Sequence, residues 1–229
     1  IRACSMSTGQ KPTFRIVVLI SGSGSNLQSL IDACDNNQIK AQITAVISNK
    51  PSVKGLDRAT TANIPTLVID HRDFSSRQEF DQHLLEAIQN FSPDLVILAG
   101  FMRILTSNFV SQFEGKLLNI HPSLLPAYQG LDTHQRAIDA GDSKAGATVH
   151  FVTPELDGGP PVLQAEVDIS PTDSPQDLAA RVLTMEHKIY PTAAQWFCDG
   201  RLTSQNGKAF LDGVVIGENG ILFDINNER

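Results

Sequence analysis

Residues 14–33 read FRIVVLISGSGSNLQSLIDA and contain three elements in succession. The first seven are mostly β-branched or apolar without alternation, which is typical of a central parallel strand covered on both faces. Leu27, Leu30 and Ile31 recur at helical spacing, so a helix is expected to follow the Gly/Ser turn. A strand, a glycine turn and a helix in this order predict an α/β unit with its loop at one edge of a sheet.

The loop of this unit, residues 21–26, has features typical of an anion-binding site. Free backbone N–H groups and the positive end of a helix dipole meet there, which suits a phosphate. The GxGxxG pattern of dinucleotide sites is not met because Leu27 occupies the last glycine position, so a monophosphate fits better. The loop alone leaves a second interpretation open, a plain strand-to-helix turn capped by Ser and Asn.

Apolar runs of strand length continue along the chain, at residues 43–48, 66–70, 95–99, 117–120, 147–152 and 162–167. Four strand–helix alternations before residue 115 predict a Rossmann-like, doubly wound, mainly parallel sheet with right-handed crossovers. A turn-rich stretch, not a helix, joins the last two runs. We therefore expect them to form an antiparallel pair toward one edge.

The C-terminal third is expected to contain one long helix and a small ribbon. Ser174 and Pro175 supply a cap and a first helical position for a helix over residues 174–197, which Pro191 should kink or break. Two glycine turns between short apolar runs predict a β-ribbon extension at 201–229. Residues 14–200 are expected to form a single α/β domain with halves at about 14–113 and 114–200, after a flexible N-terminus at 1–12.

Composition narrows the classes of function. With 229 residues, 41% of them hydrophobic, the chain can bury a full core, and a net charge of −7 argues against nucleic acid as main ligand. Neither the three cysteines nor the six histidines show metal-ligand spacing, so no metal is expected. No run reaches the roughly 18 apolar residues of a membrane span, and a reduced, cytoplasmic protein is expected.

Polar groups suited to acyl transfer follow two of the apolar runs. Asn119 and His121 lie in LLNIHPSLLP (residues 117–126), and residues two apart in extended backbone share a face. Pro122 should end the strand there. Asp157 precedes a Gly-Gly turn that lets backbone come close to a ligand. Singly, each of the three has a structural explanation, as a strand-end cap, a core histidine and a turn residue.

An apolar stretch, GFMRIL at residues 100–105, stands where a loop should begin. It has two interpretations. It is either the first turn of a core helix or an apolar wall facing a ligand at the C-terminal end of a strand, where open α/β sheets bind ligands.

Four motifs together resemble the phosphoribosylglycinamide formyltransferases. They are VLISGSGSNLQSLIDA (18–33), LAGFMRIL (98–105), LLNIHPSLLPAYQG (117–130) and VHFVTPELDGGP (149–160). NIHPSLLP with a downstream DGGP marks a wider group that includes methionyl-tRNA formyltransferase and formyltetrahydrofolate hydrolase, and the SGxGSNL loop separates them. The resemblance implies transfer of a formyl group from 10-formyltetrahydrofolate to the amine of glycinamide ribonucleotide, in purine (IMP) biosynthesis.

The resemblance also implies roles for individual residues. It places Asn119, His121 and Asp157 in catalysis, and it assigns the folate to the second half of the domain. Substrate contacts are implied for Gly24, Ser25, Asn26 and Glu186, the first three at the phosphate. Folate contacts are implied for Arg77, Met102, Arg103, Ile104, Leu105, Asn119 and Asp157. One departure is Asp132, which stands where some relatives carry a histidine. The expected partners are these small molecules alone, without nucleic acid or membrane, in a monomer or homodimer.

Three rival functions remain to be distinguished. In a formyltetrahydrofolate hydrolase, water replaces the amine and activity persists without nucleotide. A nucleotide-binding regulatory module would use the same sheet without catalysis. A dehydrogenase is disfavoured, because the last motif glycine is absent and no acidic residue ends the second strand.

Overall fold

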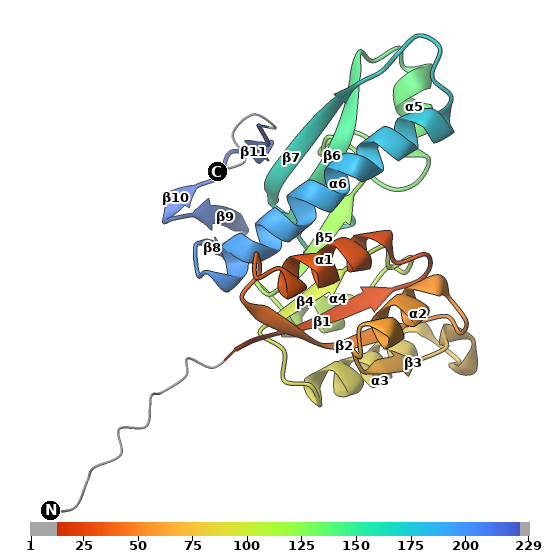
Figure 1. Ribbon diagram of the computed structural model, residues 1–229, viewed down its shortest axis with the longest axis vertical. Coiled ribbons are helices and arrows are strands. Elements are labelled where there is room, and N and C mark those ends of the chain that lie inside the picture. Colours follow the sequence, from red (N-terminus) through yellow and green to blue (C-terminus); the bar gives the residue numbers. More distant parts are fainter. Residues whose placement is uncertain (1–12, 225–229) are drawn as a thin grey trace, which may run out of the picture.

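The computed structural model describes residues 13–224; the N-terminus predicted to be flexible (1–12) lies outside the described residues, as do 225–229. An eight-stranded sheet runs through the molecule in the order β11-β7-β6-β5-β4-β1-β2-β3 (Figure 1). Its strands are β1 (Phe14–Ile20), β2 (Ala41–Ser48), β3 (Thr66–Val68), β4 (Leu95–Leu98), β5 (Leu117–His121), β6 (Lys144–Phe151), β7 (Pro161–Asp168) and β11 (Ile221–Leu222).

Helices cover both faces of this sheet, as the apolar strands require. One core cluster joins the sheet to α1, α2 and α6, and a second joins the opposite face to α3 and α4. The helices are α1 (Ser25–Asp35), α2 (Lys54–Thr61), α3 (Arg77–Gln89), α4 (Ser107–Gln112), α5 (Thr133–Asp139) and α6 (Pro175–Cys198), with a 3₁₀ turn η1 (His71–Asp73). The buried apolar runs are thus sandwiched, which explains why they lack alternation.

The expected fold class is confirmed. β1, β2, β3, β4 and β5 are mutually parallel, and β6 pairs antiparallel with both β5 and β7. The predicted antiparallel pairing of the last two long runs is therefore correct. The pairing of β6 with β5 was not predicted, and β6 begins earlier than expected, at Lys144.

The strand order reverses beside β1, whose neighbours are β2 on one side and β4 on the other. Connections leave β1 and β4 toward opposite faces, so a crevice opens beyond the C-terminal ends of these two strands. The Gly/Ser loop after β1 and the GFMRIL stretch after β4 both lie at that edge.

Two expectations for the C-terminal region differ from the structure. α6 is one unbroken helix through Pro191, so the predicted break is wrong. Burial on both sides of Pro191, by Ile189, Tyr190, Ala193 and Ala194, holds the helix against the sheet and offsets the missing backbone hydrogen bond. β8 (Leu202–Gln205), β9 (Lys208–Leu211) and β10 (Val214–Val215) form the expected ribbon, but β11 leaves it and pairs with β7.

Candidate active site

The Gly/Ser loop is held in close contact with α2. Gly24 has a φ of +68°, and a Cβ there would lie 2.6 Å from the Cα of Gly55, so glycine is required for both reasons. The backbone N–H of Gly55 donates to the carbonyl of Gly22 over 3.0 Å. α1 begins at Ser25, directly after this turn. Its first N–H groups therefore stand at a rigid corner, suited to an anion.

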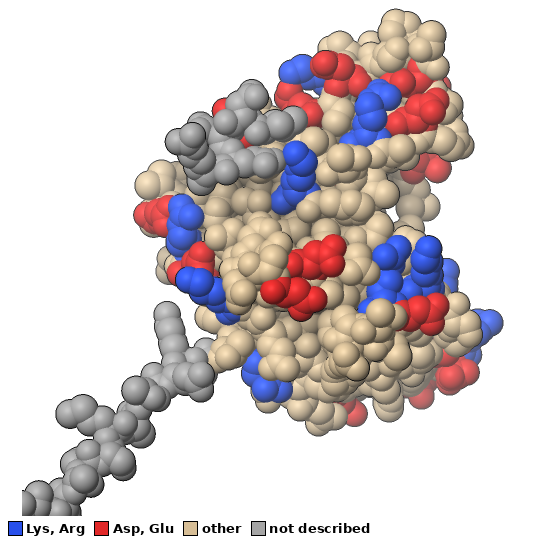
Figure 2. Space-filling view, viewed as in Figure 1, with Lys and Arg blue, Asp and Glu red and all other residues tan. Residues whose placement is uncertain are grey.

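Arg58 on α2 braces the same loop. Its Nε donates to the carbonyl of Ser23 over 2.9 Å, and its Nη1 donates to Oε1 of Gln28 over 3.2 Å. Basic side chains gather on the surface where α2 lies beside the start of α1 (Figure 2). A positive potential at the loop is the consequence, and it adds to the dipole of α1.

Asn26 and Glu186 join the start of α1 to the middle of α6. Nδ2 of Asn26 donates to Oε2 of Glu186 over 2.6 Å, and both side chains are buried. Burial raises the pKa of the Glu186 carboxyl, and the hydrogen bond from Asn26 only partly opposes this. Oδ1 of Asn26 is buried without a partner within the described part of the chain, so it is available to a ligand donor.

Residues 100–105 do not form a helix, which excludes the first of the two interpretations of that stretch. The N–H of Met102 donates to Oγ of Ser21 over 2.8 Å, and the N–H of Thr106 donates to the buried carboxylate of Asp81 over 2.6 Å. With both ends fixed, Met102 and Ile104 remain 63% and 54% exposed. Exposed apolar side chains on a fixed backbone are typical of a ligand-binding wall.

A cavity of about 790 Å³ lies between this wall, the end of β5 and α6. Asn119 and His121 reach it from β5, and Asn26 and Glu186 line its other end. Leu131 and Leu156, 70% and 49% exposed, add apolar surface at its rim. The cavity therefore has an apolar part and a polar, partly acidic part, enough room for two small molecules side by side.

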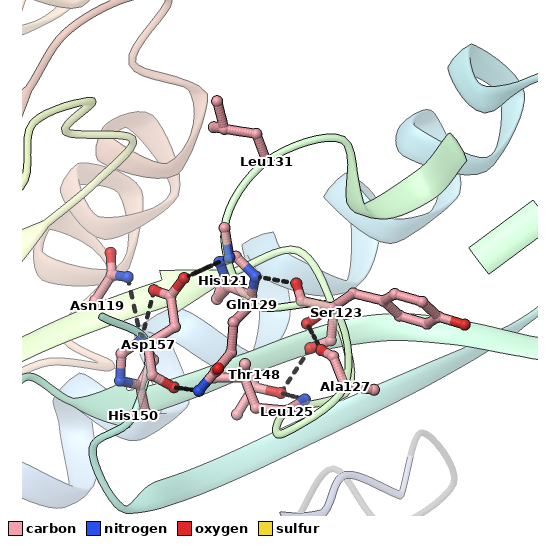
Figure 3. Close-up of polar contacts among 12 residues, drawn as sticks. Asn119, His121, Ser123, Leu125, Ala127, Gln129, Leu131, Thr148, His150 and Asp157 are labelled. Atoms are coloured by element: carbon pink, nitrogen blue, oxygen red, sulfur yellow. Dashed lines mark hydrogen bonds and ion pairs between the residues drawn. The ribbon is translucent and has the colours of Figure 1, made fainter. Parts of the chain in front are cut away.

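Asp157 lies in this cavity on a loop that holds it tightly. Its φ is +48°, a left-handed conformation that Asp and Asn tolerate better than most residues. Oδ2 accepts from the N–H of Gly130 over 3.0 Å and lies 3.4 Å from Nδ1 of His121 (Figure 3). Its carbonyl accepts from Nε2 of Gln129 over 3.2 Å. The imidazole and the carboxylate expected from the sequence thus meet in space.

Both ring nitrogens of His121 face oxygen atoms. Nε2 lies 2.9 Å from the carbonyl of Tyr128, and Nδ1 faces Asp157. A carbonyl and an ionised carboxylate only accept hydrogen bonds, so both contacts are satisfied together when the ring carries two protons. The arrangement holds the imidazole between a carbonyl oxygen and a carboxylate oxygen.

A buried polar network fixes the loop that follows His121. Oγ1 of Thr148 donates to the carbonyl of Ser123 over 2.7 Å and accepts from the N–H of Leu125 over 3.0 Å and from Nε2 of Gln164 over 3.0 Å. Nε2 of Gln164 also donates to the carbonyl of Leu125 over 2.7 Å. The loop that presents the Tyr128 carbonyl to His121 is therefore anchored to β6 and β7.

The structure brings most of the expected site residues together. Those that line the cavity are Asn26, Met102, Arg103, Ile104, Asn119, His121, Asp157 and Glu186. Gly24 and Ser25 stand next to it at the loop, and Leu105 is buried beneath the wall. Arg77 does not line it: this residue is exposed at the start of α3. The guanidinium of Arg103 lies 4.8 Å above the ring of Phe80.

Sequence reasoning missed several residues of the site. His150 was not among the expected site residues, yet its Nε2 lies 3.1 Å from Nδ2 of Asn119 and 3.9 Å from Oδ1 of Asp157. Leu131, His134 and Leu156 also line the cavity. The position of His150 depends on the pairing of β5 with β6, which sets it opposite Asn119 and for which neither strand carries a local signal.

The departure at Asp132 has a conformational explanation. Asp132 precedes α5 with a φ of +57°. Asn, Asp and His are the non-glycine residues that most often adopt this left-handed conformation, so Asp and His are interchangeable there as far as the backbone is concerned. Asp132 lines the cavity, so it adds a carboxylate there.

Residues 13–224 contain neither a metal-binding cluster nor a membrane-spanning helix. No cluster of three or more His, Cys, Asp or Glu side chains in this part of the chain is arranged to hold a metal ion. No helix in it combines the length and the apolarity that a membrane crossing needs.

Comparison with known proteins agrees with the site. The family model described as "Formyl transferase" matches residues 14–194. The chain is 53% identical over 209 residues to the phosphoribosylglycinamide formyltransferase of Escherichia coli (strain K12), a match that covers 91% of this chain and 99% of that protein. It is 47% identical to a part of the human trifunctional purine biosynthetic protein adenosine-3, covering 87% of this chain and 20% of that protein.

Solved structures give the same result. The phosphoribosylglycinamide formyltransferase of Coxiella burnetii, in complex with CHES, superposes with a TM-score of 0.88 at 47% identity and covers 93% of this chain and all of that one. Glycinamide ribonucleotide transformylase 1 of Symbiobacterium toebii superposes with a TM-score of 0.85 at 41% identity, over 90% of this chain and 99% of that one. The chain therefore belongs to the formyl transferase family and, within it, to the phosphoribosylglycinamide formyltransferases.

Proposed function

We propose that this enzyme transfers the formyl group of 10-formyltetrahydrofolate to the amine of glycinamide ribonucleotide, giving formylglycinamide ribonucleotide and tetrahydrofolate in de novo purine biosynthesis. The observation that carries the proposal is the convergence of Asn119, His121 and Asp157 in one cavity that also reaches Glu186 and Asn26. The names of two relatives support the proposal, and this chain matches both of them over nearly their whole length.

The chemistry needs two things from the protein. The neutral amine attacks the formyl carbon and forms a tetrahedral adduct whose oxygen carries negative charge, which N–H donors and a nearby cation stabilise. The amine then loses a proton, and the folate nitrogen gains one as the carbon–nitrogen bond breaks. In this proposal Asn119 donates to the oxyanion, the His121 imidazolium supplies positive charge, and Asp157 accepts the amine proton directly or through water.

The rest of the cavity suits the two substrates. The phosphate of the nucleotide would bind the N–H groups of Gly24, Ser25 and Asn26 at the start of α1, with Arg58 behind the loop. The carboxylate of Glu186 would accept from the ribose hydroxyls or the glycinamide group. A flat pteridine would lie against the wall of residues 102–105, and Arg103 offers a cation for its acidic tail. The contribution of Arg77 to that tail stays a prediction, since the side chain is outside the cavity.

A direct assay tests the function. Purified protein is mixed with 10-formyltetrahydrofolate, with and without glycinamide ribonucleotide, and tetrahydrofolate and the formylated nucleotide are measured together. We expect equal amounts of both products, and only when the nucleotide is present. Tetrahydrofolate and formate without nucleotide would instead indicate a hydrolase, and no turnover with either mixture would refute the proposal.

A further inference from the structure

We propose that His150 is a positioning residue that sets the orientation of the Asn119 amide, so that one N–H of Asn119 is free to point at the oxyanion. The inference rests on the proposed function, because it concerns the group that would bind the charged oxygen. It assigns a task in the reaction to a buried histidine that does not line the cavity.

The geometry begins with strand register. Asn119 on β5 and His150 on β6 are direct partners in the antiparallel pair, and His121 pairs in the same way with Thr148. Directly opposed residues on one face of such a pair have their Cβ atoms within about 5.5 Å. The contact of 3.1 Å between Nδ2 of Asn119 and Nε2 of His150 is therefore fixed by the sheet itself (Figure 3).

The tautomer of His150 follows from its other contact. Nδ1 lies 2.9 Å from the carbonyl oxygen of Phe151, which can only accept, so Nδ1 carries a proton. The ring is 2% exposed, and burial lowers its pKa to about 4, so it is neutral at physiological pH. A neutral ring protonated on Nδ1 has a lone pair on Nε2.

The lone pair on Nε2 of His150 determines the orientation of the Asn119 side-chain amide. Nε2 can only accept, so it takes a hydrogen bond from the NH₂ group of Asn119 and would repel the amide oxygen. An NH₂ group has two hydrogens, and one of them is used by His150. The second is left for a ligand in the cavity that Asn119 lines. If the amide were reversed, its oxygen would face the developing negative charge, and the donor would be lost.

Asp157 makes no hydrogen bond with His150, although its negative charge raises the pKa of the ring and so partly opposes the effect of burial. Its Oδ1 lies 3.9 Å from Nε2 of His150, too far for a hydrogen bond, while Oδ2 is bound to Gly130 and faces His121. The carboxylate of Asp157 therefore contacts His121, and Nε2 of His150 contacts the amide of Asn119. Each imidazole has a distinct partner, although both lie beside one acid.

Two substitutions separate the two nitrogens of the ring. In His150→Gln the side-chain oxygen can occupy the place of Nε2 and still accept from Asn119. In His150→Asn the side-chain NH₂ can occupy the place of Nδ1 and still donate to Phe151, but nothing accepts from Asn119. We expect kcat to fall roughly tenfold to a hundredfold in His150→Asn and by no more than about threefold in His150→Gln, with KM for both substrates changed little, since a whole oxyanion donor is worth about a hundredfold or more.

Urea unfolding and a second measurement complete the test. We expect the two variants to lose similar amounts of unfolding free energy although their kcat values differ. Each keeps one of the two hydrogen bonds of His150, either the one with Asn119 or the one with Phe151. Nitrogen chemical shifts of ¹⁵N-histidine-labelled wild-type protein should show a protonated Nδ1 and an unprotonated Nε2 on His150. Equal kcat values in the two variants, or a protonated Nε2, would overturn the inference. A wild-type protein without formyl transfer would refute the proposed function instead, and the nitrogen shifts would still decide the orientation of the amide.

Discussion

Nδ2 of Asn26 donates a 2.6 Å hydrogen bond to the carboxylate of Glu186, which lies 160 positions later in the chain. This bond ties the start of α1, where we propose that the phosphate binds, to the middle of α6. Burial raises the pKa of the Glu186 carboxyl, so keeping this carboxyl ionised in the cavity lowers the stability of the folded protein.

The first prediction concerns this loss of stability. Because the folded state binds the Glu186 proton more tightly than the unfolded chain, stability is lost as pH rises above the ordinary pKa of 4.5. Glu186→Gln keeps an acceptor for Asn26 and has no proton to lose. At pH 7 we expect the variant to unfold at a higher urea concentration than wild type, with a free energy of unfolding larger by about 1.4 kcal/mol for each unit by which the pKa of Glu186 is raised. Near pH 4 the two proteins should unfold at the same urea concentration.

Its control is Glu86→Gln on the exposed face of α3, which should change stability little at either pH. In the transfer assay Glu186→Gln should raise KM for glycinamide ribonucleotide. A variant less stable than wild type at pH 7 would contradict the argument.

The second prediction concerns the oxyanion donor. Asn119→Ala should lower kcat by about a hundredfold or more, corresponding to roughly 3–4 kcal/mol of transition-state stabilisation. KM for the nucleotide should change little, since its phosphate binds elsewhere. Asn108→Ala, at an exposed position on α4, serves as the control. A loss below tenfold would remove Asn119 from the proposed role.

The third prediction concerns Asp157. Asn fits the left-handed backbone at this position and can still accept from the N–H of Gly130, so Asp157→Asn should fold normally. Without the charge, neither His121 nor the attacking amine has its partner, and we expect kcat to fall by about 10²–10⁴-fold. Glu155→Gln removes an exposed charge from the same turn and should leave kcat nearly unchanged. If Asp157→Asn also left kcat nearly unchanged, a regulatory module would become the better interpretation.

The fourth prediction concerns Arg58. Arg58→Met removes both hydrogen bonds to the loop region, so KM for glycinamide ribonucleotide should rise about tenfold while kcat stays near wild type. Lys54→Met removes the same charge from the exposed start of α2 and should have a smaller effect. Steady-state kinetics at two salt concentrations would show whether charge alone explains the change. Equal effects of the two variants would mean that Arg58 does not position the loop.

The fifth prediction concerns Thr148. Thr148→Val has nearly the same shape but leaves the N–H of Leu125 and the carbonyl of Ser123 buried without partners, so it should destabilise the protein by about 3 kcal/mol. Thr44→Val loses a single buried hydrogen bond to Ile16 and should cost about 1 kcal/mol. The difference is measurable by urea unfolding, and similar costs would show that the network contributes little.

Much of the fold could be predicted because the central strands, such as β1 and β4, are continuous apolar runs followed within two residues by Gly. The convergence of Asn119, His121 and Asp157 was predictable in outline, since two of them share a strand face and the third follows the run that forms β6. The pairing of His150 with Asn119 was not, because it depends on β6 lying beside β5, and nothing local to either strand specifies its neighbour. The unbroken helix at Pro191 depends likewise on burial against the sheet, which outweighs the local cost of proline.

The antiparallel β5–β6 pair has a consequence for how this enzyme can vary. The Asn119–His150 and His121–Thr148 pairs lie in one ladder with the Ile120–Val149 pair between them, so a slip of β6 by one residue would turn both partners to the opposite side of the sheet. We therefore expect this part of the sheet to tolerate a change in chain length only in the loops around these two strands, because only there would both side-chain pairs keep their places.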